Sequence, residues 1–192
     1  MKNNEHVLVL FVGRTGSGKS SLISKLCEKY GFRQLISNTT RPKRGENDND
    51  HVFVTVDDYK KAKVDGNIAA ETEINGNYYY ATVEQLYEAD FYTIDPFGRN
   101  ELLKRDLPGI RFVTIYISCP DDMREKRAVG KRGDNKQTYR ARDFSERSQF
   151  RRFVTDEEWD YSVKNMSFPK ALSVIKWVCD VEKVWKNHLE EE

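Results

Sequence analysis

The sequence predicts an α/β fold with a parallel central sheet. Apolar runs alternate with longer polar segments, which is typical of buried strands separated by helices. The first run, Val7 to Val12, leads directly into a glycine-rich loop and then into the helix-like segment Leu22 to Tyr30. A strand, loop and helix in this order favour parallel pairing around the loop. The chain shows neither internal repeats nor low-complexity segments.

Five short apolar runs are expected to form the core strands, because buried parallel strands are apolar along their whole length. They are Val7 to Val12, Arg33 to Ser37, Phe91 to Asp95, Phe112 to Ile117 and Tyr161 to Lys164. Helices are expected between several of them. A final helix opens at Pro169, since proline suits the first helical turn, and its apolar residues recur at near-helical spacing. We expect this helix to pack on the sheet.

Residues 38–90 are predicted to form an inserted β-rich lobe. The segment Asn38 to Asp50 is polar and rich in turn-forming residues. The segments Val52 to Val56 and Ile68 to Tyr80 are typical of short strands, with a hairpin turn at Asn75-Gly76-Asn77. The lobe therefore interrupts the α/β pattern between two core strands.

Residues 121–154 are predicted to form a lid with its flanking helices. From Asp121 to Phe153 the sequence is highly charged, and its apolar positions are too sparse for a large buried face. We expect a helix, an exposed lid and a second helix. The core of this single domain, which spans residues 1–192, is expected to comprise residues 1–37, 91–120 and 155–192.

The loop after the first strand carries the most specific motif in the chain. Its sequence, Gly13-Arg14-Thr15-Gly16-Ser17-Gly18-Lys19-Ser20, is the pattern of a phosphate-binding P-loop. The glycines let successive N–H groups face one anion, and the next helix adds its positive end. Lys19 is expected to reach the β- and γ-phosphates of a nucleotide, and the Ser20 hydroxyl to bind Mg²⁺. These residues and Ser21 are the expected ATP-binding set; the alternative is a glycine-rich surface turn.

The composition is that of an ordinary soluble enzyme whose partner is a small anion. The 192 residues include 32 basic and 31 acidic side chains, a balance that favours neither a nucleic-acid nor a membrane surface. No apolar stretch approaches about 18 residues, and the polar start lacks a signal-peptide pattern, so a cytoplasmic monomer or homodimer is expected. Cys27, Cys119 and Cys179 are widely spaced, which predicts reduced thiols and no zinc site.

A second basic motif lies on the loop Ser37-Asn38-Thr39-Thr40-Arg41-Pro42-Lys43-Arg44-Gly45-Glu46. A guanidinium group can donate two hydrogen bonds to one phosphate, so Arg41 and Arg44 are suited to grip a phosphate from different sides. The alternative is a solvated basic turn, because exposed runs of charge are common.

Further motifs follow in order along the chain. They are Gly76-Asn77-Tyr78-Tyr79, Ile94-Asp95-x-x-Gly98, Ile115-Tyr116-Ile117, Arg127 to Gly133, Arg142 and Asp160-Tyr161-x-Val163-x-Asn165. With the P-loop and the Arg41 loop, this ordered set resembles the guanylate kinase family of nucleoside monophosphate kinases over nearly the whole chain. The resemblance implies a P-loop NTPase core of three layers, an inserted lobe that binds the nucleoside monophosphate, and a helical lid.

The resemblance also implies which residues hold the acceptor monophosphate. The family's phosphate-gripping positions fall on Arg41, Arg44 and Tyr79. His51 stands where the family has a further tyrosine; an imidazole can still donate to phosphate, with a new pH dependence, or His51 is a surface residue without a role. The expected acceptor-binding set is Ser37, Arg41, Arg44, His51, Tyr79 and Asp95.

The chain departs from the family where guanine is read. Of the family's glutamate, serine or threonine, and aspartate, only the last is present, as Asp95; Ala70 and Ala81 occupy the other positions. Alanine offers no hydrogen bond to a base. Strand alternation places Glu71 on the opposite face from Ala70, unless a one-residue bulge returns it. Otherwise the acceptor base differs, or an unusual nucleotide stacks against Tyr80, where the family has glycine.

The lid of this family carries arginines, which here fall on Arg127, Arg132 and Arg142. They would neutralise charge and exclude water during transfer, and the alternative is a salt-bridged helix surface. Asn165 ends the strand that in this family lies near the adenine of ATP, and the alternative is an ordinary turn asparagine. With Lys19, the arginines are the expected catalytic residues for transfer of the γ-phosphoryl of ATP to a nucleoside 5′-monophosphate, with GMP or dGMP as the leading acceptor and Mg²⁺ as the cofactor.

Three other functions stay open. A GTPase switch is suggested by Asp95-Pro96-Phe97-Gly98, but the nearest match to its guanine-reading motif, Asn135-Lys136-Gln137-Thr138, lacks the aspartate. A binding module that has lost catalysis tends to lose the P-loop lysine, and this chain keeps Lys19. A kinase of the same fold for a modified nucleotide or a ribose phosphate is favoured by the missing base readers.

Overall fold

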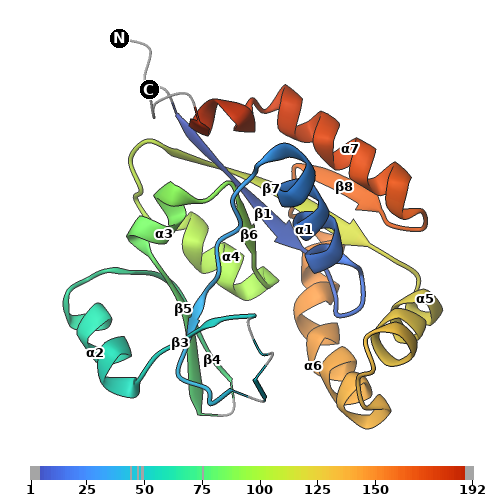
Figure 1. The fold of residues 1–192 in the computed structure, drawn as a ribbon, viewed down its shortest axis with the longest axis horizontal. Helices are drawn as coiled ribbons and strands as arrows, with labels where there is room; N and C mark the ends of the chain where they lie inside the picture. Colours follow the sequence, from blue (N-terminus) through green and yellow to red (C-terminus); the bar gives the residue numbers. More distant parts are fainter. Residues whose placement is uncertain (1–4, 44, 47, 49, 75, 189–192) are drawn as a thin grey trace.

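The computed structural model describes residues 5–188 except residues 44, 47, 49 and 75. Within these residues the chain forms two sheets of four strands each (Figure 1). The core sheet has the order β6-β1-β7-β8, and all of its strands are parallel. Its strands are β1 (His6–Val12), β6 (Phe91–Thr93), β7 (Ile110–Ser118) and β8 (Tyr161–Lys164). The predicted parallel sheet is therefore confirmed.

Helices cover both faces of the core sheet. They are α1 (Lys19–Tyr30), α3 (Val83–Glu88), α4 (Pro96–Leu103), α6 (Lys136–Thr155) and α7 (Phe168–Val181). Alternate residues of β1 point to opposite faces. Val7, Val9 and Phe11 pack in one cluster with α1 and α7, whereas Leu8 and Leu10 pack in another with α3, α4 and α6. The result is the three-layer α/β core that the sequence predicts.

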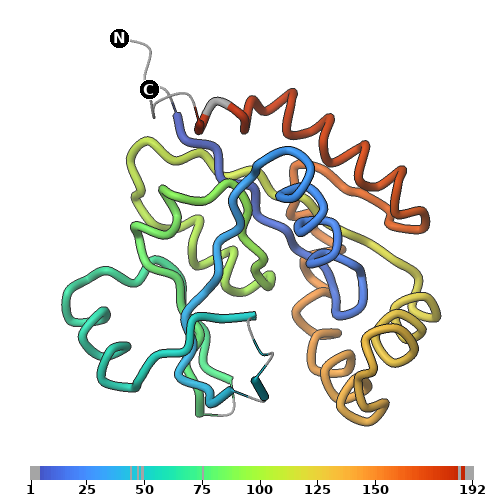
Figure 2. The backbone as a smooth tube through the Cα atoms, viewed as in Figure 1, coloured from blue at the N-terminus to red at the C-terminus, as the bar shows by residue number. Residues whose placement is uncertain are grey.

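The second sheet has the order β3-β2-β5-β4 and stands apart from the core sheet, as the tube in Figure 2 shows. Its strands are β2 (Asn38–Thr39), β3 (Val52–Phe53), β4 (Ile68–Ile74) and β5 (Asn77–Thr82). Helix α2 (Val56–Val64) packs on one face through Tyr59, whose ring stacks on Tyr78 at a centroid distance of 4.0 Å. Gly76 in the hairpin has a φ of 74°, a conformation that suits glycine; Asn75 lies outside the described residues.

Two predicted strands are wrong in whole or in part. Residues 33–37 make only an isolated bridge, from Gln34 to Phe91, because the chain turns away toward the second sheet after Leu35. The strand predicted for Val52 to Val56 ends at Phe53. There Thr55 caps α2, accepting from the Asp58 N–H while the Asp58 carboxylate accepts from the Thr55 N–H, and this capping box begins a helix instead.

The charged region after β7 forms a helical arm in three parts. They are α5 (Asp121–Glu125), the π-helical turn η1 (Lys126–Lys131) and α6. The two helices agree with the prediction, and the lid role of the segment between them stays a prediction. The expectation of sparse burial is wrong for α6, because Tyr139, Phe150 and Phe153 are all buried.

After β8, α7 leads into the short 3₁₀ helix η2 (Val184–His188). Its Asn187 side chain exchanges hydrogen bonds with the backbone of Val7 and donates to Asp90, which fixes the end of the described chain to the sheet. Within residues 5–188, apart from the four gaps, no helix is long and apolar enough to cross a membrane.

Candidate functional site: a phosphate-binding loop enclosed by the helical arm

The P-loop turns sharply between β1 and α1 because two of its glycines adopt positive φ angles. Gly16 has a φ of 75° and Gly18 a φ of 93°. A Cβ on Gly16 would lie 2.5 Å from the Arg124 backbone oxygen, and one on Gly18 would lie 2.5 Å from Asn165 Nδ2. Glycine is required at both positions for conformation and for space. Helix α1 begins at Lys19, so its positive end faces the loop.

The Lys19 side chain folds back toward the first residue of the P-loop. Its ammonium group donates a hydrogen bond to the Gly13 backbone oxygen. Burial lowers the pKa of Lys19 to about 8, whereas the charge of Glu146 acts in the opposite direction. A nucleotide phosphate would offer this cation a stronger partner than a carbonyl.

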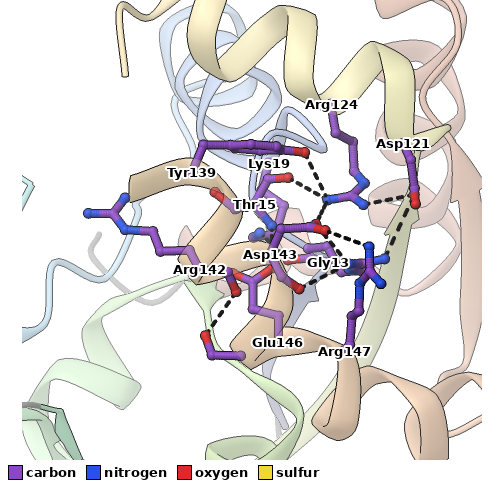
Figure 3. Close-up of polar contacts among 12 residues, drawn as sticks. Gly13, Thr15, Lys19, Asp121, Arg124, Tyr139, Arg142, Asp143, Glu146 and Arg147 are labelled. Carbon is purple, nitrogen blue, oxygen red and sulfur yellow. Dashed lines mark hydrogen bonds and ion pairs between the residues drawn. The ribbon is translucent and has the colours of Figure 1, made fainter. Parts of the chain in front are cut away.

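A buried ion network ties the loop to the helical arm (Figure 3). The Arg124 side chain is 2% exposed and donates to Asp143 at 2.6 Å, to Asp121 at 2.7 Å and to the Thr15 backbone oxygen at 3.1 Å. Arg14 donates to the same Asp143 at 2.7 Å. Burial opposes the charge of Arg124, but the bonds to Asp121 and Asp143 raise its pKa overall. The P-loop and α6 are thus packed as one unit.

A second carboxylate of α6 reaches the loop itself. The Glu146 Oε2 atom accepts a hydrogen bond from the Thr15 backbone N–H at 2.8 Å. Glu146 follows Asp143 by one helical turn, so both point to the P-loop from the same face of α6 (Figure 3).

The predicted site residues Arg127 and Asn165 lie together behind the loop. Asn165 is buried and donates to the Ser17 backbone oxygen at 2.8 Å. Arg127 donates to the Asn165 backbone oxygen at 3.0 Å, and it also contacts the Ser17 backbone oxygen and Cys119 Sγ. In this arrangement Arg127 braces the P-loop, and its expected role in phosphoryl transfer stays a prediction.

The other two predicted arginines, Arg132 and Arg142, lie farther along the helical arm. Arg132 donates to Asp134 at 2.7 Å and lies near enough to Lys19 to lower the pKa of that lysine further. Arg142 is half-buried, and Figure 3 shows its side chain directed away from the Arg124–Asp143 network. Both lie on the helical arm, and their role in transfer stays a prediction.

The predicted acceptor residues gather beside the second sheet. Ser37 Oγ and His51 Nδ1 are 3.0 Å apart, and the rings of His51 and Tyr79 meet edge to face at a centroid distance of 5.3 Å. Arg41 is held by Asp48 at 2.7 Å, which raises its pKa, and Tyr79 adds to this effect. We call Ser37, Arg41, His51 and Tyr79 the acceptor cluster. Arg44 lies outside the described residues.

The predicted base-reading region is largely apolar. Ala70 and Ala81 face each other across β4 and β5, and both are buried in the cluster that includes Leu102. Asp95 caps α4, its Oδ1 accepting from the N–H groups of Phe97 and Gly98 at 2.9 Å and 3.0 Å. Its second oxygen makes neither of these cap bonds.

Neither proposed compensation at this region fits the structure. A bulge does occur in β4, between Ile68 and Ala70, but Glu71 accepts from Tyr59 and from Lys63 on α2 at 2.8 Å and 2.9 Å. Glu71 is therefore directed to the helix-covered face. Tyr80 is 4% exposed and packs against Tyr59, so its ring is not available to stack on a base.

Comparison with known proteins identifies the family. A family model described as guanylate kinase matches residues 5–182. The chain belongs to the guanylate kinase family. Membership in the guanylate kinase family confirms the expected enzyme class, an ATP-dependent nucleoside monophosphate kinase.

Individual members of the guanylate kinase family match most of the chain. The guanylate kinase of Hydrogenovibrio crunogenus is 33% identical over 176 residues, which cover 86% of this chain and 83% of that protein. The guanylate kinase of Clostridium perfringens is 25% identical over 210 residues, with 100% and 93% covered. The solved structure of the guanylate kinase from Anaplasma phagocytophilum shares the fold, with a TM-score of 0.64 at 20% identity over 93% of this chain and 87% of that one.

Sequence reasoning missed the residues of α6 that contact the P-loop. Asp143 and Glu146 lie among many charged residues, so neither can be distinguished from a solvent-exposed carboxylate by residue type alone. Their positions relative to Tyr139, Phe150 and Phe153 give spacings of four, three, four and three residues, as expected for one helical face. That periodicity is the sequence signal that places Asp143 and Glu146 on the same face of α6 as the buried aromatic residues.

Proposed function

We propose that this protein transfers the γ-phosphoryl group of MgATP to the phosphate of a nucleoside 5′-monophosphate, with GMP or dGMP as the leading acceptor. The observation that supports the proposal is that one domain carries two separate cationic clusters, one at the P-loop around Lys19 and one beside the second sheet around Arg41. The P-loop with Lys19 suits the donor, and the acceptor cluster around Arg41 suits a second phosphate. Two such sites are what phosphoryl transfer between nucleotides requires.

The residues of both sites would act by position and charge. The attacking oxygen of a phosphomonoester is already largely ionised at neutral pH, because its second pKa is about 6, so no general base is needed. Arg41, Tyr79 and His51 would orient that phosphate, while Lys19 and Arg132 would neutralise charge on the group in transfer. Arg127 and Asn165 would hold the P-loop in shape.

The donor set at the P-loop fits a magnesium ion that arrives with the nucleotide. Ser20 is exposed in the first turn of α1 and offers a hydroxyl oxygen, a hard ligand suited to Mg²⁺. Among the described residues no three His, Cys, Asp or Glu side chains form a group that could hold a metal. Bound with the nucleotide, the ion would neutralise charge between the β- and γ-phosphates.

The acceptor base is the open part of the proposal. The names of the relatives favour guanine. The buried pair Ala70 and Ala81 offers no hydrogen bond, and Asp95 retains one oxygen outside its cap bonds. A kinase for a modified nucleotide or a ribose phosphate is the second candidate, and the apolar pair is the observation that favours it.

A coupled assay of ADP release tests the proposal. Purified protein is supplied with MgATP and, one at a time, GMP, dGMP, AMP, CMP, UMP, dTMP and ribose phosphates. We expect turnover with GMP and dGMP above all others. Turnover confined to a ribose phosphate would support the second candidate, and no ADP with any acceptor would contradict both. We further propose that the protein acts in the cytoplasm, as a monomer or homodimer.

A further inference from the structure

Glu146 contacts the loop that the proposed reaction requires to bind the phosphates of a nucleotide. Its carboxylate accepts from the Thr15 N–H at 2.8 Å, and Thr15 belongs to the loop whose N–H groups face phosphate. The charge of Glu146 also acts on Lys19 and on Arg132, the two cations assigned above to the transferred group. A single carboxylate thus bonds an amide of the proposed donor site and acts electrostatically on two of its cations.

The neighbouring carboxylate, Asp143, has a different environment. It is bound by Arg124 at 2.6 Å and by Arg14 at 2.7 Å, and Arg147 lies at 3.6 Å. These pairs fix α6 to the P-loop whether or not Glu146 is engaged. The partner of Glu146 within 3.5 Å, in the described part of the chain, is the backbone of Thr15.

We infer that Glu146 is an internal substitute for phosphate, which occupies the P-loop in the nucleotide-free enzyme and must rotate away when the triphosphate binds. This inference rests on the proposed function, because it assigns a form of regulation to the same site. Since Asp143 anchors the helix, displacement requires only a change of side-chain rotamer at Glu146. The triphosphate therefore competes with the Glu146 carboxylate. The apparent affinity of the enzyme for the triphosphate is reduced according to the fraction of molecules in which Glu146 occupies the loop.

The contact also has a consequence for selectivity. A ligand with several phosphates makes many contacts with the loop, so it can replace the carboxylate, whereas an anion with one phosphate gains little more than Glu146 already supplies. The P-loop would then be protected from small anions until a nucleotide arrives.

Binding measurements on two variants test the inference. The probes are ATP and inorganic tripolyphosphate, each titrated calorimetrically without Mg²⁺ into the wild type, Glu146→Gln and Glu146→Ala. Glutamine keeps the size and an oxygen acceptor but removes the charge. We expect roughly three- to tenfold tighter binding of both probes by Glu146→Gln, and at least as large a gain by Glu146→Ala.

Glu125→Gln is the matched control. Glu125 is a carboxylate of the same arm that pairs with Lys136 at 3.4 Å, and within the described part of the chain its ion pairs are with Lys136 and Arg140 and not with the P-loop. Its affinities should equal those of the wild type. A second readout is hydrogen exchange at the Thr15 amide in the nucleotide-free protein, which should be faster in Glu146→Ala than in the wild type.

The outcomes separate this inference from the proposed function. Tighter binding of tripolyphosphate by Glu146→Gln supports the inference even if no monophosphate is turned over. Unchanged or weaker binding of the probes by Glu146→Gln overturns the inference, even if kinase activity is normal. Glu146 would then either have no effect on phosphate binding or favour it. Failure of the wild type and both variants to bind either probe also overturns it. If Glu146→Ala does not fold, Glu146→Gln decides.

Discussion

The donor and acceptor sides of this molecule differ in how firmly their functional residues are held. The P-loop is fixed from two directions, by the Arg124–Asp143 network of the helical arm and by Arg127 and Asn165 behind it. The acceptor cluster lies on short strands and a loop, where Arg41 relies on Asp48 and His51 on Ser37. The difference indicates that the proposed donor site is held by contacts with the core, whereas the proposed acceptor site is held by local contacts in the second sheet.

The largest expected effect comes from removing the cation of the donor site. Lys19→Ala should lower kcat by about 10³-fold, the scale expected for losing one preorganised charge at the transferred group. Circular dichroism and thermal unfolding should match the wild type, because burial lowers the pKa of Lys19 to about 8, which means that the folded state disfavours the charged form. Comparable turnover in the variant would remove the P-loop from the mechanism.

The next effect tests the rigidity of the donor side. Asp143→Ala leaves the buried Arg124 without its 2.6 Å partner, so we expect a loss of about 3 kcal/mol in the free energy of unfolding. Chemical denaturation measures this loss. Asp156→Ala, which removes an exposed partner of Arg152, is the control and should cost less than about 1 kcal/mol. Equal effects would mean that the network does not hold the loop.

A change in the acceptor cluster should affect only one substrate. Arg41→Ala should reduce kcat/KM for the monophosphate by roughly 10- to 100-fold, as expected for losing a charged hydrogen bond, with KM for ATP unchanged. Lys43→Ala on the same loop should have a smaller effect. An equal loss for both nucleotides would contradict the division into donor and acceptor sides.

The smallest effect concerns pH. Burial lowers the pKa of His51 below its ordinary value, although the Ser37 backbone acts in the opposite direction, so the free imidazole is neutral near pH 7. A bound phosphate would raise that pKa. Protonated His51 should therefore strengthen binding of the acceptor phosphate at low pH. This contribution is lost as the pH rises through the pKa of His51 in the complex.

Acceptor KM, measured from about pH 6 to about pH 8, tests this sign. Over this range the acceptor KM should rise roughly threefold more in the wild type than in His51→Gln, whose side chain cannot titrate. The titration of the acceptor phosphate is common to both proteins and cancels in the comparison. Parallel profiles would mean that His51 does not touch the phosphate.

Features with a local cause could be predicted from the sequence. The P-loop follows from glycine spacing after an apolar strand, and α7 from its apolar period, so both agree with the structure. The helix α2 was missed, because Val52 to Val56 has strand-like composition and the capping box of Thr55 and Asp58 went unrecognised.

Features that depend on distant contacts could not be predicted. The resemblance to the family implies a lid role for Arg127, but it does not reveal that the guanidinium donates to the backbone oxygen of Asn165, which follows it by 38 residues. The burial of Tyr80 against Tyr59 likewise depends on a helix that was not expected. The contact of Glu146 with Thr15 joins residues 131 positions apart, and no local pattern specifies such a pairing.

The central claim is that one phosphoryl group passes directly from one nucleotide to another. ³¹P nuclear magnetic resonance of a reaction with MgATP and GMP tests it, because the β-phosphates of ADP and GDP and free phosphate are observed together. Direct transfer should give ADP and GDP in equal amounts, with free phosphate at the level of an enzyme-free control. ADP accompanied by free phosphate and no GDP would contradict it.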